Sequence, residues 1–263
     1  MTLTVTLFQT DLNWENKPAN LDHFTQQMEG VVTSDLIVLP EMFSTGFSMQ
    51  SEKLAESMDD ISVRWMLERA ADLNTVVCGS LIIRDGDNCF NRFIWAQPNG
   101  ETEHYDKRHL FRMSEEHENY APGSKKLILN ANGFRICPQV CYDLRFPVFS
   151  RNVQQDGGAL TPAYDLLLYV ANWPAARSTH WRALLQARAI ENQAYVIGVN
   201  RIGADGNGIA YQGDSCVINH QGEYLEDMTN KNGVATITLE KKPLEDYRAA
   251  FPAWKDSDPY ELF

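Results

Sequence analysis

Short apolar runs alternate with amphipathic segments along most of this chain. Residues 3–8 alternate threonine with large apolar side chains, which predicts a strand with one buried face. Residues 35–39 and 165–171 are nearly continuous apolar runs, which is typical of strands covered on both faces. Apolar residues at helical spacing predict amphipathic helices over residues 18–30, 59–74 and 178–193.

The remaining segments predict hairpins and two further helices. In the helix over 59–74, we expect Ile61, Trp65 and Ala70 to face the core. Turn residues at 98–100 and 130–133 each separate two strand-like runs, which predicts two hairpins. The other predicted elements are strands over 75–83, 88–96, 101–105, 126–129, 134–140, 195–200, 211–219 and 234–239, and helices over 146–155 and 244–250.

This mixture of strand–helix units and hairpins predicts an α/β fold. Two mixed sheets packed face to face with helices outside would form a four-layer α-β-β-α sandwich. No linker, low-complexity tract or clear internal repeat divides the chain, so we expect one domain over residues 1–263, although the length alone would allow two. A chain of this size can bury about three quarters of its unfolded surface, so it needs no stabilising disulfide or metal.

Composition narrows the classes of function. The chain has 23 Lys and Arg against 35 Asp and Glu, a formal charge of -12, which disfavours nucleic acid and anionic membranes as partners. Its five cysteines form no CxxC pair and lie near no paired histidines, so we expect no disulfide framework, no metal and no cofactor. The first residues resemble a strand more than a signal peptide, and no apolar run could span a membrane, which favours a cytoplasmic protein.

One cysteine follows an apolar strand directly. The run that begins at Phe134 ends at Cys141, and a polar turn and a helix-like start come next. A side chain at such a corner is held out at the carboxyl edge of a sheet, beside the backbone N–H groups of the following helix. This is how α/β folds present a nucleophile. Cys141 could equally be an ordinary buried cysteine, and only catalytic partners elsewhere would decide between the two interpretations.

Candidate partners follow other predicted strands. Glu41 and Lys107 each come just after an apolar strand, and Glu116 lies in the acidic loop over 112–123. Each could be a surface charge when considered alone. Together they suit a cysteine nucleophile, because a carboxylate can take the thiol proton and an ammonium can stabilise an oxyanion. Neither His109, where a strand is ending, nor His180, which we expect to pack or cap a helix, is an obvious alternative base.

Three short motifs carry a resemblance to a known family. They are PE at 40–41, KRHLF at 107–111 and CYDLRFP at 141–147, and RAIEN at 188–192 extends the similarity into a late helix. In this order and spacing they resemble the signatures of the nitrilase (carbon–nitrogen hydrolase) superfamily, over nearly the whole chain. The resemblance implies the α-β-β-α fold, and it implies Cys141 as nucleophile, Glu41 as general base, Lys107 as oxyanion donor and Glu116 as a supporting glutamate, with Glu115 and Glu118 close by.

The sequence is most similar to the omega-amidase branch of that superfamily. Tyr142 and Asp143 follow Cys141, where true nitrilases typically have Trp and Glu. Val148 stands where many relatives have Glu after Phe-Pro, and we interpret this departure as a difference in helix packing. The branch implies hydrolysis of monoamides of short 2-oxo dicarboxylic acids, such as 2-oxoglutaramate or 2-oxosuccinamate, through a cysteine thioester. The products would be the oxo-dicarboxylate and ammonia.

The substrate contacts are hypotheses. The backbone N–H of Tyr142 would join Lys107 at the oxyanion. Arg177 is a candidate for the substrate carboxylate, or else a surface arginine at a helix start. Trp173 and Phe43 could wall the pocket or belong to the core. The family also implies a homodimer, to which aromatic residues near the end of the chain could contribute, namely Phe251, Trp254, Tyr260 and Phe263.

Three alternatives remain open at this point. Another amide hydrolase of the superfamily, acting on N-carbamoyl or aliphatic amides, has the same motifs. A non-catalytic binding protein on the same fold would be favoured by loss of Glu41, Lys107 or Cys141, yet all three are present. A papain-like protease would need a late catalytic histidine and a glutamine before the cysteine, and neither is placed convincingly.

Overall fold

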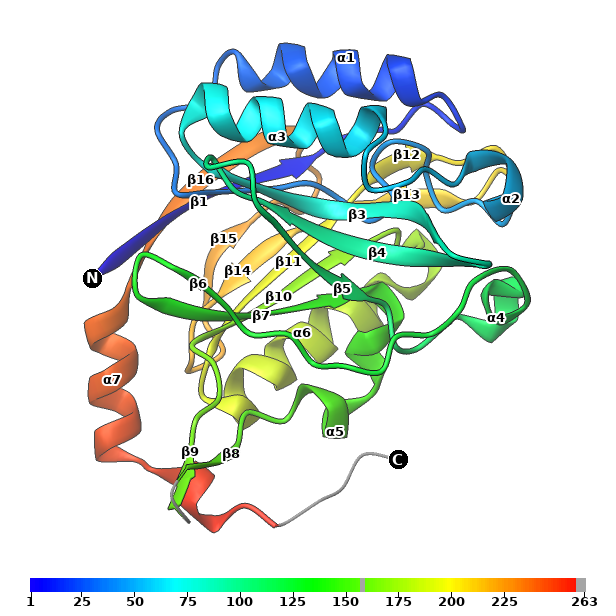
Figure 1. Ribbon diagram of the computed structural model, residues 1–263. Helices are drawn as coiled ribbons and strands as arrows, with labels where there is room; N and C mark the ends of the chain where they lie inside the picture. The colour runs from blue at the N-terminus through cyan, green and yellow to red at the C-terminus, as the bar shows by residue number, and fades with distance from the viewer. Residues whose placement is uncertain (157–158, 259–263) are drawn as a thin grey trace.

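The computed structural model describes residues 1–156 and 159–258. Within these residues, two six-stranded mixed sheets lie face to face between helices (Figure 1), which confirms the predicted sandwich. Across the first sheet the order is β16 (Gly233–Glu240), β1 (Thr2–Gln9), β2 (Leu36–Val38), β3 (Val76–Asp85), β4 (Asn88–Ala96) and β5 (Thr102–Asp106). Across the second it is β15 (Tyr224–Asp227), β14 (Cys216–Ile218), β11 (Tyr195–Asn200), β10 (Leu166–Ala171), β7 (Phe134–Val140) and β6 (Leu129–Ala131).

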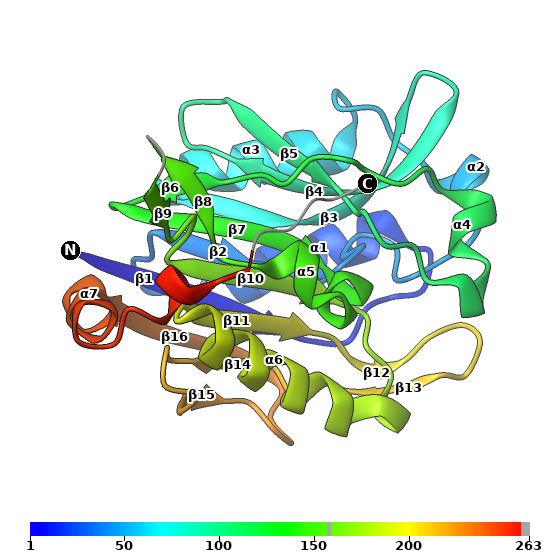
Figure 2. The same ribbon diagram turned by 90° about the horizontal axis from the view of Figure 1, so that it is seen from below.

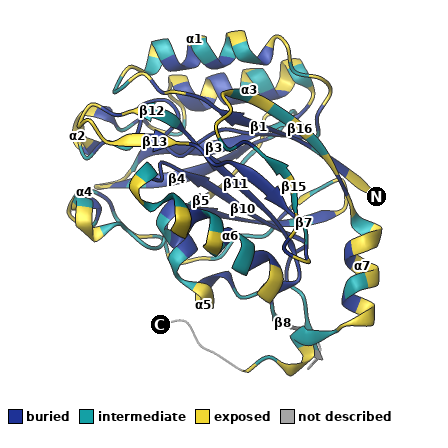
Figure 3. Cartoon of the chain, turned by 180° about the vertical axis from the view of Figure 1, so that it is seen from behind, coloured by how far each residue is buried: buried dark blue, intermediate teal, exposed yellow. Residues whose placement is uncertain are grey.

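Helices cover the outer faces of both sheets. Helices α1 (Lys17–Met28) and α3 (Ile61–Leu73) lie on the first sheet, whereas α5 (Pro147–Ser150) and α6 (Ser178–Asn192) lie on the second (Figures 1 and 2). The strands between these layers are largely buried, and exposure concentrates on the outer helix faces and the loops (Figure 3). The remaining elements are α2 (Ser51–Leu54), α4 (Glu116–Asn119), α7 (Lys241–Ala250) and the short strand pairs β8 (Gln154–Asp156) with β9 (Ala159–Thr161) and β12 (Ile202–Ala204) with β13 (Ala210–Gln212).

Parallel pairing explains where a site can form. Strands β1, β2 and β3 run parallel to one another, and so do β7, β10 and β11. Their carboxyl ends bring the residues that follow each strand to one edge of the sandwich, which is where ligands bind in such sheets. Residues 36–39 and 165–171 of the two apolar runs are buried in this arrangement, as predicted for strands covered on both faces.

Two predictions about burial are wrong. The strand β1 is covered on both faces from Val5 onward, because Phe8 on its threonine-bearing face packs against Phe24 of α1. The alternation of threonine and apolar residues therefore reflects polar partners, such as Thr236 opposite Thr6, and no solvated face. Ile61 does not face the core; it is the first residue of α3 and is 50% exposed.

Two predictions about element length are also wrong. The helix expected over 146–155 ends at Ser150, because the buried side chain of Asn152 bonds to both backbone groups of Tyr164 and fixes an extended turn there. The strand expected over 211–219 is broken into β13 and β14 by Gly213 and Asp214, both with positive φ. The short strand β15 was not predicted. The strands over 88–96, 134–140 and 195–200 agree with the prediction to the residue.

Three further observations concern membrane spans, metal sites and disulfides. None of the helices in the described part of the chain has the length and apolarity needed to cross a bilayer. Among the same residues, no three His, Cys, Asp or Glu side chains gather where they could hold a metal ion. All five cysteines are buried and free of disulfides.

Candidate active site

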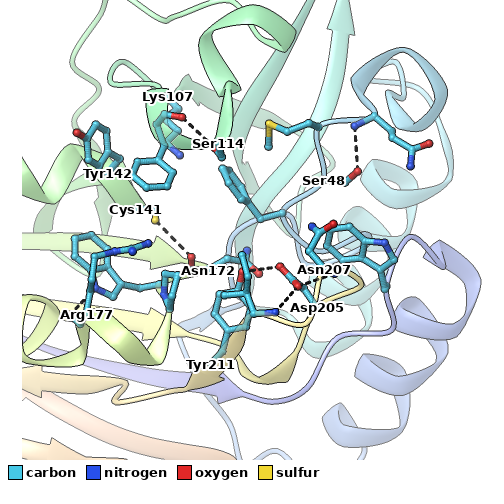
Figure 4. A pocket seen from close by; sticks show the side chains of 18 of the residues that line it. Ser48, Lys107, Ser114, Cys141, Tyr142, Asn172, Arg177, Asp205, Asn207 and Tyr211 are labelled. Carbon is cyan, nitrogen blue, oxygen red and sulfur yellow. Dashed lines mark hydrogen bonds between the residues drawn. The ribbon is translucent and has the colours of Figure 1, made fainter.

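The predicted catalytic residues meet at one edge of the sandwich. Glu41 lies in the turn after β2, Lys107 follows β5 directly, and Cys141 begins a 3₁₀ turn (Cys141–Arg145) after β7. Glu116 opens the short helix α4. All four are buried, and Cys141 and Lys107 line the same cavity (Figure 4). The structure therefore brings these four side chains together.

Cys141 occupies a strained corner. Its φ is +46°, in the left-handed region that costs a residue with a side chain about 1–2 kcal/mol. The corner is held by Asp143, whose Oδ2 accepts the N–H of Val140 at 3.0 Å and whose carbonyl accepts the N–H of Phe146 at 3.0 Å. The thiol is thereby turned into the cavity, with Sγ 4.0 Å from the carbonyl oxygen of Asn172.

Asp143 also links the Cys141 corner to the segment around Lys107. Its buried carboxylate accepts bonds from the Tyr105 hydroxyl at 2.7 Å, the His109 N–H at 3.0 Å and the His109 ring Nδ1 at 2.7 Å. Tyr105 and His109 lie two residues before and two residues after Lys107. One carboxylate therefore bonds on both sides of the lysine and beside the cysteine, which fixes the two catalytic segments relative to each other.

Lys107 lies between two carboxylates. Its ammonium donates to Glu41 Oε1 at 2.9 Å and to Glu116 Oε1 and Oε2 at 2.9 and 3.0 Å, with all three side chains inaccessible to solvent. Glu116 is fixed by the Phe111 N–H, which donates to its Oε2 at 2.6 Å. Glu115 and Glu118 are exposed, so Glu116 is the glutamate of this acidic loop that reaches the site.

An asparagine that the sequence analysis missed joins the two carboxylates. Asn91 Nδ2 donates to Glu41 Oε1 at 2.7 Å and to Glu116 Oε1 at 3.2 Å. Its own Oδ1 accepts the Ser80 hydroxyl at 2.8 Å, which orients the amide. Asn91 lies inside β4, where nothing in the local sequence pattern separates it from other strand residues.

The electrostatics favour a protonated thiol beside a charged lysine. Burial raises the pKa of the Cys141 thiol well above its usual value, and the nearby Glu41 carboxylate raises it further, against the opposing charge of Lys107. Burial alone would lower the pKa of Lys107, but the carboxylates of Glu116 and Glu41 outweigh it and the pKa rises. Burial also raises the pKa of Glu116. At neutral pH the resting thiol keeps its proton, so chemistry at sulfur needs a base.

The cavity above Cys141 has a volume of about 390 Å³. The aromatic part of its wall comes from Trp14, Phe47, Phe111, Tyr142, Trp173 and Tyr211. Figure 4 places Arg177 to one side of Cys141 and Asn172, with Asp205 and Asn207 on the other. A cavity of this size suits a small organic molecule.

Of the two residues suggested as pocket walls, Trp173 lines the cavity and Phe43 does not. Trp173 lines the cavity, and its indole Nε1 donates to the carbonyl of Arg177 at 2.8 Å. Phe43 is fully buried in the core between the first sheet and its helices, where its ring packs against Trp65 at 5.7 Å. The left-handed Met42 turns the chain after Glu41 away from the cavity, and Phe47 returns to line it.

Two arginines line the cavity. Arg177, the predicted carboxylate partner, lies there with its guanidinium 5.4 Å from the centre of the Phe111 ring. Arg145 was missed, although it stands four residues after the nucleophile; its guanidinium lies 4.8 Å from the Trp173 ring. Its Nη2 donates to Nδ1 of His180 at 3.1 Å, so exposed His180 contacts Arg145 and does not pack or cap as expected.

Comparisons with known proteins agree with this geometry. The family model described as carbon-nitrogen hydrolase matches residues 4–249. The chain is 48% identical to omega-amidase YafV of Escherichia coli K12, over 99% of each protein, and 27% identical to 2-oxoglutaramate amidase of Bacillus subtilis, over 97% of this chain and 98% of that one. Among solved structures, XC1258 of Xanthomonas campestris, described as a CN-hydrolase superfamily protein with an arsenic adduct in its active site, is 43% identical over all of both chains with a TM-score of 0.96.

Proposed function

The chain belongs to the carbon–nitrogen hydrolase (nitrilase) superfamily, and from this premise we propose that it is an omega-amidase. It is a cysteine-dependent amidase that hydrolyses the terminal amide of 2-oxo dicarboxylic acid monoamides, such as 2-oxoglutaramate and 2-oxosuccinamate, to the oxo-dicarboxylate and ammonia. The observation that carries the proposal is the buried Lys107 ammonium, held between Glu41 and Glu116 in a cavity that also holds a cysteine thiol.

In the first half-reaction, we propose that Glu41 removes the thiol proton as the sulfur attacks the amide carbon. The raised pKa of the Cys141 thiol supports a need for a base at this step. The amide oxygen becomes an oxyanion, which Lys107 and the Tyr142 N–H would stabilise; a strong donor of this kind contributes about 3–4 kcal/mol. Glu41 then returns its proton to the nitrogen, and ammonia leaves the thioester.

In the second half-reaction, water would replace ammonia. Glu41 takes a proton from the water as its oxygen attacks the thioester carbon, and Lys107 again stabilises the oxyanion. The carbon–sulfur bond breaks, Cys141 recovers its proton, and the free acid leaves. Glu116 bonds to Lys107, whereas Glu41 bonds to both Lys107 and the Cys141 thiol, which favours a supporting role for Glu116 that holds the ammonium in place.

Two arginines that line the cavity support the proposed substrate class. A 2-oxo dicarboxylic acid monoamide carries a carboxylate at the end opposite the amide, and guanidinium groups bind carboxylates in a planar, bidentate way. We propose that Arg145 and Arg177 bind this carboxylate, since both line the cavity. Arg145 stacks on Trp173 and bonds to His180, which restrains it before the substrate arrives.

The first experiment is ammonia release from 2-oxoglutaramate by the wild type and by Cys141→Ala. We expect turnover in the wild type alone, with the variant folded by circular dichroism. Turnover that persists in Cys141→Ala would contradict the proposed nucleophile. A wild type that leaves 2-oxoglutaramate intact but hydrolyses N-carbamoyl or aliphatic amides would retain the mechanism and replace the substrate.

The assembly and location are also proposals. We propose a homodimer, supported by the resemblance to the family and by Phe251, whose side chain is 58% exposed. Tyr260 and Phe263, suggested for the same contact, lie outside the described residues. Light scattering in solution should give about twice the 29.9 kDa mass of one chain, and the mass of a single chain would contradict the proposal. A cytoplasmic location is proposed as well, which cell fractionation would test.

A further inference from the structure

A second cavity shares a wall residue with the catalytic one and has a volume of about 500 Å³. Four of its lining side chains are basic, and they define what we call the basic pocket: Arg108, His109, Arg112 and His117. No Asp or Glu is among the residues that line it, whereas Glu15 and Asp205 line the cavity above Cys141. In a chain of formal charge -12, the basic pocket is a local reversal of charge.

The basic pocket is built from the two catalytic segments. Its four basic residues all lie within 108–117, the stretch that joins Lys107 to Glu116. Tyr142 and Phe146, which also line it, come from the turn after β7 that holds the nucleophile. Tyr142 is the shared residue, because it lines the catalytic cavity as well (Figure 4). A ligand in the basic pocket would therefore touch both segments.

The ring of His109 is held in a defined orientation. Its Nδ1 bonds to Asp143 Oδ1 at 2.7 Å, and its face stacks on the Phe146 ring with 3.8 Å between centroids and 9° between planes. The side chain is 22% exposed. With Nδ1 engaged, Nε2 is the nitrogen that this partly exposed ring can offer to a ligand.

The other basic side chains are differently restrained. Arg112 is exposed, and in the part of the chain that the structure describes its side chain forms no hydrogen bond or ion pair. Arg108 donates from Nη1 to the Ser124 carbonyl at 3.1 Å. The His117 ring lies 3.8 Å from the carboxylate of Glu118, which is 65% exposed and competes little with a bound ligand. The basic pocket thus combines cations that are held in place with one that can turn toward a ligand.

We propose that the basic pocket binds a small oxyanion, either a carboxylate or a phosphate. Guanidinium groups present forked N–H donors that match the oxygens of both groups. The two histidines add donors when they are protonated. A volume of about 500 Å³ lies within the range of small-molecule sites. This binding site is separate from the catalytic cavity, and the inference goes beyond the proposed amidase function without depending on it.

A bound anion would connect the acidic loop to the catalytic corner. Arg112 and His117 lie in that loop, whereas His109 is bonded to Asp143 in the corner that begins at Cys141. An anion that these three basic residues share would slow local opening of the loop, because a ligand stabilises the state to which it binds.

The test is calorimetric titration of inorganic phosphate and of glutarate into the wild type and into Arg112→Gln. The Arg112 side chain is exposed, so the variant should fold. We expect binding of at least one anion to the wild type, and we expect Arg112→Gln to weaken it about 10-fold, the size of one charge-assisted hydrogen bond. Tighter binding of phosphate would indicate a phosphate-bearing ligand, and tighter binding of glutarate would indicate a carboxylate.

Two matched variants separate the basic pocket from other cations. Arg177→Gln removes an arginine from the catalytic cavity, and Arg64→Gln removes an exposed arginine from α3. Both should retain the binding that Arg112→Gln loses. Loss in Arg177→Gln alone would place the anion in the catalytic cavity, and an equal loss in Arg64→Gln would show a general effect of net charge. Either result overturns the proposal, as does the absence of binding by both anions.

Amide hydrogen exchange gives an independent measurement of where the anion binds. The anion should slow exchange in residues 108–117 of the wild type, and the slowing should be smaller in Arg112→Gln. Exchange in residues 172–178, around Arg177, should stay the same. Slowing confined to residues 172–178 would contradict the proposal. No substrate enters either experiment, so failure of the omega-amidase assignment would leave both results interpretable.

Discussion

The two ends of β10 carry two buried charge clusters of opposite design. At its carboxyl end, two carboxylates share the single ammonium of Lys107. At its amino end, Asp165 is one carboxylate among three cations: Arg135 at 3.1 Å, Arg248 at 2.8 Å and Lys241 at 3.1 Å. The first cluster has more negative than positive groups, and the second has more positive than negative ones.

The difference shows in how protons are held. Hydrogen bonds from Arg135 and the charge of Arg248 outweigh burial and lower the pKa of Asp165 from 3.8 to about 2, so this carboxylate stays ionised. In the other cluster, burial and crowding of like charge raise the pKa of Glu116 and of the Cys141 thiol. We infer that the amino end of β10 is built for stability and the carboxyl end for proton transfer, as is common at the two ends of parallel strands.

Glu41→Gln should have the largest effect, and the effect should be on activity and not on stability. Loss of the base should lower kcat by about 10³- to 10⁴-fold, the usual contribution of general acid–base catalysis. The free energy of unfolding should change little, because Lys107 keeps Glu116 as its partner. Steady-state kinetics and urea unfolding of the same preparation would measure both. Parallel loss of activity and stability would mean that the cluster is structural.

Asp165→Asn should show the reverse pattern. Removing the shared carboxylate leaves Arg135, Arg248 and Lys241 close together without a counter-charge. Loss of one partner in a buried ion pair typically costs about 3–5 kcal/mol of unfolding free energy. Urea unfolding should reveal this loss at pH 7, while KM and kcat of the folded fraction stay near wild type. A variant with reduced kcat but normal stability would contradict the assignment.

Strong acid should destabilise the amino end of β10. The pKa of Asp165 is lower in the folded chain than its ordinary value of 3.8, so the stability it contributes is complete above pH 4 and is lost as the pH falls toward 2. The shift corresponds to about 2 kcal/mol. The difference in unfolding free energy between wild type and Asp165→Asn should therefore shrink over this interval. A constant difference would show that protonation of Asp165 is not involved.

The smallest expected effect is on thiol reactivity. The Glu41 carboxylate raises the pKa of Cys141, so Glu41→Gln should lower that pKa and shift iodoacetamide alkylation of the thiol to lower pH. The nearly inactive variant would then have the more readily ionised cysteine. The rate of alkylation against pH, followed by mass spectrometry of the Cys141 peptide, gives both profiles. An upward shift in the variant would place the main influence of Glu41 elsewhere.

The proposed catalytic residues could be predicted from sequence because Glu41 and Cys141 closely follow apolar runs, Lys107 directly follows a predicted strand, and all three lie in short motifs that resemble a known family. Glu41, Lys107 and Cys141 stand at such points, and the geometry of parallel strands brings the ends together. Asn91 and Asn172 both bond to Glu41 and could not be assigned in this way, since they lie 50 and 131 positions away from it. A buried asparagine inside or after a strand looks the same in sequence whether its amide bonds to a carboxylate or to the backbone of a turn.

The errors also have physical causes. The helix predicted over 146–155 has suitable residues locally, but Asn152 gains its hydrogen bonds from Tyr164 and from Asn192 on α6, so tertiary contacts end the helix early. Phe43 was expected either at the cavity wall or in the core, and it lies in the core. The left-handed conformation of Met42 reverses the direction of the following side chain, and local patterns contain no signal for that torsion.

The backbone of Cys141 has a consequence for engineering. Its left-handed torsion is one that glycine adopts freely and that cysteine or alanine adopts with difficulty. The free energy of unfolding of Cys141→Gly should therefore exceed that of Cys141→Ala by about 1 kcal/mol, and its unfolding temperature should be higher. Both variants should be inactive. A trade-off between stability and activity would then lie at one backbone torsion, the one that aims the sulfur at the cavity.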